Sequence, residues 1–176
     1  MNETTFNPNA HVGAMWQHDD GRDKWAVTFR VESLEGDDFD RFKELQRAHY
    51  GEVAGFKGAL DRLNPDWSKY LALEKSGRLH LVKARAWNGT LVGYSAHLVH
   101  EHLHYKHVLV ADDDVFYVTP TMRGRGVAKA MRAFACETLK ARGVKLALAR
   151  VKPEIPHTHL EKLGYTVMET VYAKVL

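Results

Sequence analysis

The sequence predicts a mixed α/β domain with a central sheet flanked by helices, and three observations lead to this fold class. Residues 112–131 run from a β-branched and aromatic segment through Arg-Gly-Arg-Gly into a helical repeat, which predicts a strand, a turn and a helix. Two alternating segments, 78–87 and 90–102, flank Asn88-Gly89 and predict a β-hairpin. The remaining segments add strands and helices in mixed order.

The first regular element is expected after an irregular arm. Residues 1–23 show no clear period, so we place the domain at 24–176. Trp25–Glu35 alternates between apolar and polar residues and predicts a strand. A turn at Gly36-Asp37 then leads into a helix with one apolar face, which glycines from Gly51 onward are expected to loosen or break. That face carries Phe39, Phe42, Leu45, His49 and Val53, and we interpret His49 there as a packing residue.

The middle of the chain predicts a second helix and the hairpin. Asn64-Pro65 marks a helix start and Gly77 an end, so the helix covers Asp66–Ser76. The dipeptide Asn88-Gly89 favours a type I′ turn between the two hairpin strands. We therefore expect the two strands to be adjacent and antiparallel.

The last third predicts two more strands and a short helix. Thr119-Pro120 ends the strand that begins near Asp112, because proline cannot donate a ladder hydrogen bond. The following helix continues to about Arg142. A strand over 144–151, a short helix over 157–163 and a final alternating strand over 165–176 complete the order.

Length and charge restrict the class of protein. With 176 residues and one cysteine, we expect one domain without an internal disulfide, in a reducing compartment such as the cytoplasm. No apolar run approaches the roughly 20 residues that span a bilayer. The net charge of +3 is unevenly distributed: residues 1–60 carry 7 Lys/Arg and 11 Asp/Glu, whereas 116–176 carry 11 and 4. A basic C-terminal third suits a small polyanionic ligand, and no basic run with interleaved aromatics indicates nucleic acid.

The glycine turn at 123–126 has the chemistry of an anion site. Glycines let the backbone approach a ligand closely, and the first amides of the following helix have no intrahelical acceptor. The helix dipole is positive at that end, and Arg123 and Arg125 add donors that stay protonated. The alternative is an ordinary strand-to-helix connection with two surface arginines.

The same residues resemble a known family. Arg123-Gly124-Arg125-Gly126-Val127-Ala128 is similar to the (Gln/Arg)-x-x-Gly-x-(Gly/Ala) motif of the GNAT superfamily of acyl-CoA-dependent N-acyltransferases, with Val118-x-Pro120 in front of it. Glu161-Lys162-Leu163-Gly164-Tyr165 also resembles a C-terminal motif of that family. The resemblance implies a mixed sheet with splayed parallel strands that hold acyl-CoA. It assigns coenzyme binding to Val118, Arg123, Gly124, Arg125, Gly126, Val127, Ala128 and Lys129.

The resemblance also implies a reaction. Acetyl would pass from acetyl-CoA to a primary amine by direct attack, with the pantetheine between the 112–118 strand and the 144–151 strand and in contact with the Val118 backbone. The acceptor would be a small-molecule amine or a protein lysine or N-terminus, and the acidic N-terminal part favours a cationic one. We expect no membrane partner and no nucleic acid, and a homodimer is possible. The alternative function is an acyl-CoA-binding regulatory protein with little turnover.

Three consecutive aspartates are the first candidates for the base that deprotonates the amine. Side chains alternate along a strand, so Asp112 and Asp114 should share a face with Val118 while Asp113 points away. Family members often carry a carboxylate near this position, which makes Asp112 and Asp114 the catalytic candidates. The alternative is a solvated strand entry with mutual repulsion.

The expected acid is missing. Many family members have tyrosine before the Glu-Lys-Leu-Gly run, near the coenzyme sulfur, and Leu160 stands there in this chain. His157, His159, Tyr117 or solvent could take its place.

Two further groups of side chains have candidate chemistry. The histidine-rich segment of His97, His100, His102, His104 and His107 could bind zinc, but we interpret it as a polar strand and loop near the acceptor site, with no metal. Cys136 lies among basic residues on its helix and is interpreted as a surface thiol rather than an acyl-enzyme nucleophile.

Overall fold

One six-stranded sheet runs through the computed structural model, which describes residues 14–19, 24–53, 63–152 and 158–174. The strand order is β1-β2-β3-β4-β5-β6. All neighbours are antiparallel except β5 and β6, which are parallel. The predicted fold class, a mixed α/β domain with a central mixed sheet, is confirmed. The strands are β1 (Met15–Asp19), β2 (Lys24–Val31), β3 (Leu79–Ala86), β4 (Leu91–His102), β5 (Tyr105–Val118) and β6 (Val144–Leu148).

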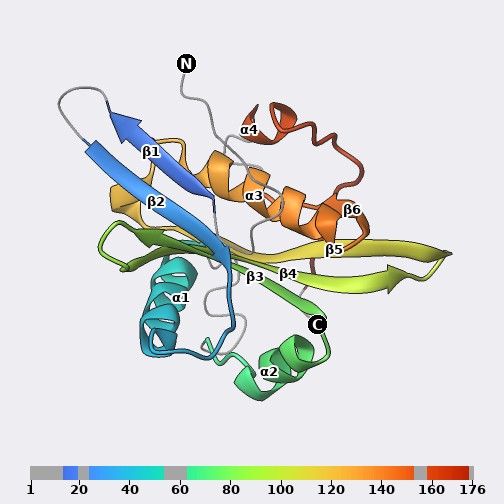
Figure 1. Ribbon diagram of the computed structural model, residues 1–176. Coiled ribbons are helices and arrows are strands. Elements are labelled where there is room, and N and C mark those ends of the chain that lie inside the picture. Colours follow the sequence, from blue (N-terminus) through green and yellow to red (C-terminus); the bar gives the residue numbers. More distant parts are fainter. Residues whose placement is uncertain (1–13, 20–23, 54–62, 153–157, 175–176) are drawn as a thin grey trace.

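Helices cover both faces of the sheet (Figure 1). The helices α1 (Phe39–Val53) and α2 (Trp67–Lys75) lie on one face, and α3 (Val127–Ala141) lies on the other with the short α4 (Thr158–Glu161) nearby. None of the helices in the described residues has the length and apolarity that crossing a bilayer requires. Two hydrophobic layers result. The α3 layer is built mainly on Phe29, Val82, Val118, Met131 and Ala135, and the α1/α2 layer on Phe42, Leu45, Leu81, Tyr94 and Tyr117.

The sheet begins earlier than the sequence predicts. β1 lies within residues 1–23, where no period was found, and it pairs with β2 from Met15 opposite Thr28 to Asp19 opposite Lys24. A five-residue edge strand gives too few alternations to be recognised from its sequence. The strand predicted over 25–35 is β2, and it ends at Val31.

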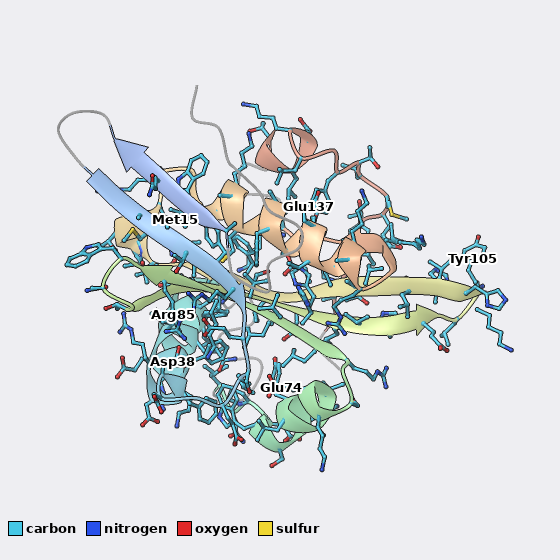
Figure 2. All side chains as sticks on the ribbon, in the orientation of Figure 1. Met15, Asp38, Glu74, Arg85, Tyr105 and Glu137 are labelled. Atoms are coloured by element: carbon cyan, nitrogen blue, oxygen red, sulfur yellow. The ribbon has the colours of Figure 1, made fainter. Side chains whose placement is uncertain are left out.

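A buried ion pair attaches the start of α1 to the sheet. Lys83 on β3 is almost fully buried, and its Nζ lies 2.8 Å from Asp38 Oδ1. Arg85, two residues along the same strand, donates to the other Asp38 oxygen at 2.7 Å (Figure 2). α1 then continues through Gly51 and ends at Val53, two residues after the glycine near which a break was predicted. Asp66 caps α2 by accepting a hydrogen bond from the Lys69 amide at 3.0 Å.

The hairpin of β3 and β4 is confirmed, but its turn is not type I′. Gly89 has φ of +83°, whereas Asn88 does not have a positive φ, which a type I′ turn requires. Gly89 N donates to Ala86 O at 2.9 Å, and Ala86 N donates to Thr90 O at 2.9 Å. The connection is therefore a three-residue loop that closes on a left-handed glycine, the next most common hairpin connection.

A second hairpin follows, and β5 is longer than predicted. It starts at Tyr105 rather than near Asp112, and Tyr105 lies at the far end of the β4–β5 hairpin (Figure 2). The sheet thus includes most of the histidine-rich segment. β6 ends at Leu148, three residues before the predicted end.

The predicted final strand is wrong for the residues that the structure describes. Tyr165–Lys174 forms no strand, and Val167 and Tyr172 are 83% and 91% exposed. The predicted helix before it is present as α4 and a turn, with Leu160 buried. An alternating segment needs an edge strand beside it to become a strand, and sequence alternation alone does not supply that partner.

Candidate functional site

β5 and β6 separate near the middle of β5. The two strands pair from Leu109 opposite Val144 to Asp112 opposite Leu148, and β6 ends there. β5 continues to Val118 and stays paired with β4 on its other side. On the side that β6 has left, no strand of the described residues covers β5 between Asp113 and Val118.

The backbone of this free edge is oriented for an added extended chain. Thr119 N donates to Val92 O of β4 at 2.9 Å, so the amide before it points the other way. Val118 therefore presents its backbone N–H and C=O to the free side, and so does Phe116. The Val118 carbonyl already accepts a hydrogen bond from Arg123 Nε at 2.9 Å.

The glycine turn predicted at 123–126 lies at the end of β5 and leads directly into α3. Gly124 and Gly126 have φ of +75° and +79°, which L side chains rarely adopt. The first α3 hydrogen bond runs from Ala130 N to Gly126 O at 3.0 Å. The amides of Val127, Ala128 and Lys129 precede that bond and have no acceptor within the helix, so they are available to an anion.

Trp16 of β1 packs on this turn, a contact that no sequence pattern predicts. Its Nε1 donates to Arg125 O at 3.1 Å. A Cβ atom at Gly126 would lie 3.0 Å from the Trp16 ring, so the ring and the positive φ both favour glycine there. β1 therefore supports the glycine turn, although it precedes residue 24, where the domain was predicted to begin.

Arg123 is bound to the protein itself. Its Nη2 lies 2.6 Å from Glu52 Oε2 of α1, and its guanidinium lies 5.4 Å from the Tyr117 ring centre. Together with the bond to the Val118 carbonyl, these contacts join the end of α1 to the turn. Arg125 and Lys129 are also exposed and lie beside the α3 N-terminus.

The three aspartates alternate among themselves, but a shift in the β4–β5 register puts each on the face opposite to the one predicted relative to Val118. Ala96 pairs with Val115 and the next residue, His97, pairs with Asp113, so Asp114 is an extra residue in the β5 ladder. Such a bulge reverses the alternation. Asp113, not Asp112 or Asp114, lies on the α3 face together with Phe116 and Val118.

Asp113 forms a buried ion pair. Its Oδ2 accepts from Arg132 Nη1 of α3 at 2.9 Å, and the two side chains are 3% and 5% exposed. The Arg132 guanidinium also lies 4.1 Å from the Phe116 ring centre, which confirms the shared face. Four buried polar atoms in this region have no hydrogen-bond partner among the described residues: Ser95 Oγ, His97 Nδ1, Asp113 Oδ1 and Arg132 Nε.

Asp112 is held by two basic side chains at the point where the strands separate. His100 Nε2 lies 2.7 Å from Oδ2, and Arg150 Nη2 lies 2.7 Å from Oδ1. The hydrogen bond to Asp112 raises the pKa of His100 above its usual value. Both carboxylate oxygens are therefore engaged before any substrate arrives.

Asp114 lies on the face of the sheet opposite to Asp113 and α3, toward α2. Its Oδ2 accepts from the Tyr70 hydroxyl at 2.6 Å, and the residue is exposed. Burial, and then this hydrogen bond, raise the pKa of Tyr70. Of the two carboxylates predicted as catalytic, Asp114 is the one that keeps an oxygen without a partner among the described residues.

A cluster of aromatic and acidic side chains continues from Asp114 along this face. The His49 ring stacks on Tyr117 at 5.0 Å between ring centres, and its Nδ1 lies 3.1 Å from the Tyr94 hydroxyl. Glu52, one turn further along α1, accepts from the Tyr117 hydroxyl at 3.2 Å. Burial lowers the pKa of His49, although the Glu52 carboxylate opposes this. The sequence placed His49 on the correct helix face but gave no sign of these partners.

The other sequence candidates lie apart from this cluster. Cys136 Sγ lies 3.1 Å from the Tyr165 hydroxyl on the α3 side. His102 Nδ1 accepts from the His104 amide at the end of the hairpin, and His97 is buried under α3. Within the described residues, no three metal-binding side chains are grouped to hold an ion. His157 and the His159 side chain lie outside the described residues.

Comparison with known proteins agrees with this geometry. The acetyltransferase (GNAT) family model matches residues 39–165. No curated protein matches significantly.

Solved acetyltransferase structures share the fold. One from Trypanosoma brucei superposes with a TM-score of 0.66 at 18% identity, covering 85% of this chain and 99% of that one. A ribosomal-protein-alanine N-acetyltransferase from Brucella melitensis superposes with a TM-score of 0.60 at 20% identity, covering 84% of this chain and 97% of that one. A predicted acetyltransferase from Clostridium acetobutylicum, solved with acetyl-CoA, superposes with a TM-score of 0.62 at 15% identity, covering 84% of this chain and 95% of that one. With the family model matching most of its length, and with a strand pair that separates in front of a glycine turn, this chain belongs to the GNAT acetyltransferase family.

Proposed function

We propose that the protein transfers an acetyl group from acetyl-CoA to a primary amine, by direct attack of the amine on the thioester. The observation that carries this proposal is the free edge of β5. It begins after Asp112, where β6 ends, and leads to the glycine turn and the open N-terminus of α3.

The residues present suit acetyl-CoA. Pantetheine is an extended chain with amide groups, and the free edge of β5 offers it the backbone groups of Phe116 and the backbone N–H of Val118, whose carbonyl already accepts from Arg123. The pyrophosphate matches the amides of Val127, Ala128 and Lys129. Exposed Arg125 and Lys129 add positive charge, while Arg123 supports the turn through Glu52.

The amine would approach from the face of the sheet that carries α1 and α2. Asp114 and Glu52 supply negative charge there, and tyrosines supply ring faces that attract cations. Because both oxygens of Asp112 are engaged, we assign to Asp114 the role of receiving the amine as an ammonium ion. An acceptor of this class is a polyamine, a lysine side chain or an aminoglycoside.

No protein nucleophile is needed for this reaction. The Cys136 thiol is hydrogen-bonded to Tyr165, with no paired base among the described residues. Leu160 is buried at the position where many family members carry a tyrosine, and we assign protonation of the departing thiolate to solvent.

The test is turnover with product identification. The protein is mixed with acetyl-CoA and one amine at a time, and free thiol and N-acetylated amine are measured together. The proposal predicts equal amounts of both, dependent on the amine. Coenzyme binding without amine-dependent release across the panel would instead favour a regulatory acyl-CoA-binding protein.

A further inference from the structure

The cluster on the α1/α2 face contains one side chain with the properties of a base, and it is not one of the aspartates. His49 is partly exposed, and its ring stacks on Tyr117, which lies within the free stretch of β5. Its Nδ1 is 3.1 Å from the Tyr94 hydroxyl, and its Nε2 has no hydrogen-bond partner in the described part of the chain. One ring nitrogen is therefore fixed and the other is available.

We propose that His49 is a catalytic residue that takes the proton from the attacking amine, an inference that rests on the acetyl-transfer function proposed above. The amine nitrogen gives its electron pair to the thioester carbon, so a C–N bond forms. The C–S bond breaks, and sulfur leaves with its electron pair. An ammonium substrate first loses one proton to Nε2 of His49, which frees the nitrogen lone pair for the attack, and His49 passes that proton to solvent. The second proton leaves the nitrogen for solvent once the C–N bond has formed, and the thiolate takes its proton from solvent.

The surroundings of His49 suit this task. Burial raises the pKa of Tyr94 far above its usual value, so its hydroxyl stays protonated and neutral. In the tautomer that carries its proton on Nδ1, His49 donates to the Tyr94 oxygen and keeps the Nε2 lone pair. The same hydrogen bond persists when Nε2 gains a proton, so the charged product is stabilised without rearrangement.

Charged groups around His49 are balanced. Glu52 on α1 and Asp113 on β5 raise its pKa, while Arg123 in the glycine turn and Lys152 after β6 lower it. Burial is the largest effect and lowers the pKa, so the imidazole is neutral at pH 7. Asp114 would attract the ammonium form of the substrate, and His49 would accept the proton from it.

The decisive variant is His49→Gln, which keeps a polar side chain of similar length but cannot take a proton. We expect kcat to fall roughly 100-fold or more, and the rising limb of the pH profile below about pH 6.5 to disappear. The affinity for acetyl-CoA and the melting temperature should change little. The matched control is His107→Gln, which replaces an exposed histidine near the start of β5 and should leave the pH profile unchanged.

A second variant keeps the proposal testable if His49→Gln does not fold. Tyr94→Phe removes the acceptor of the Nδ1 proton while keeping the ring, so the imidazolium loses a hydrogen bond and the rising limb should move to lower pH. A histidine with only a packing role would not shift that limb in either variant, and an unshifted limb overturns the proposal.

One measurement is independent of turnover. Imidazole nitrogen NMR of the folded protein at pH 7 should show His49 neutral and protonated on Nδ1. A protonated Nε2 at pH 7, or a charged ring, overturns the inference whatever the enzyme does. A wild-type protein that releases no thiol with any amine counts against acetyl transfer itself, and the variants' kinetics are not needed to reach that conclusion.

Discussion

Replacing Asp113 with asparagine should destabilise the protein strongly, because it removes one partner of a buried ion pair. The substitution leaves the Arg132 guanidinium charged, 5% exposed and without its carboxylate. Removing one partner of a buried ion pair costs about 3–5 kcal/mol. For a chain of this length, about 2–4 °C of melting temperature is lost per kcal/mol, so the expected drop is about 6–20 °C.

The assay is thermal unfolding of Asp113→Asn beside Asp114→Asn. Asp114 is exposed and has one hydrogen bond from Tyr70, so its replacement should cost only about 1 kcal/mol. Replacing both partners, with Asp113→Leu and Arg132→Met, should recover most of the loss because no buried charge is left alone. Equal melting temperatures for the two single variants would show that Asp113 does not face α3 and that the bulge is placed wrongly.

Three further predictions concern the coenzyme, the amine and pH. Lys129→Glu should greatly reduce the melting-temperature rise that acetyl-CoA produces, because it puts a carboxylate beside phosphate without changing the glycine turn; an undiminished rise would place the phosphates elsewhere. Asp114→Asn should raise KM for the amine roughly 10-fold while leaving the low-pH limb of kcat in place, and loss of that limb would make Asp114 the base. The raised pKa of His100 stabilises the fold below about pH 6.5, and this stabilisation is lost as pH rises through the raised pKa. The melting temperatures of wild type and His100→Gln should therefore differ at pH 5.5 and converge near pH 9; a constant difference would mean that the Asp112 contact does not depend on charge.

Strong local signals made most of the fold predictable. The Arg-Gly-Arg-Gly turn, the hairpin around Asn88-Gly89 and the helix beginning near Phe39 combine turn chemistry with a clear period. Each is present in the structure. The type of the hairpin turn was wrong, because Asn88-Gly89 also occurs in a turn where only the glycine is left-handed.

The candidate site was less predictable, because one extra residue reverses the faces of a strand. The bulge at Asp114 has no sequence signal, and it moves Asp113 to the α3 face, away from the position that alternation gives it. The contacts of His49 with Tyr94 and Tyr117 join residues 45 and 68 positions apart, so no local pattern contains them. Trp16 reaches the glycine turn from an edge strand too short to be recognised.

Hydrogen exchange along β5 tests most directly whether acyl-CoA lies against the free edge of this strand. Tyr117 and Thr119 direct their amides toward β4, whereas Phe116 and Val118 direct theirs to the open side. When acetyl-CoA is added, we predict that exchange slows at Phe116, Val118 and the first amides of α3, with little change at Tyr117 and Thr119. Saturating acetyl-CoA that protects none of the open-side amides would contradict the account.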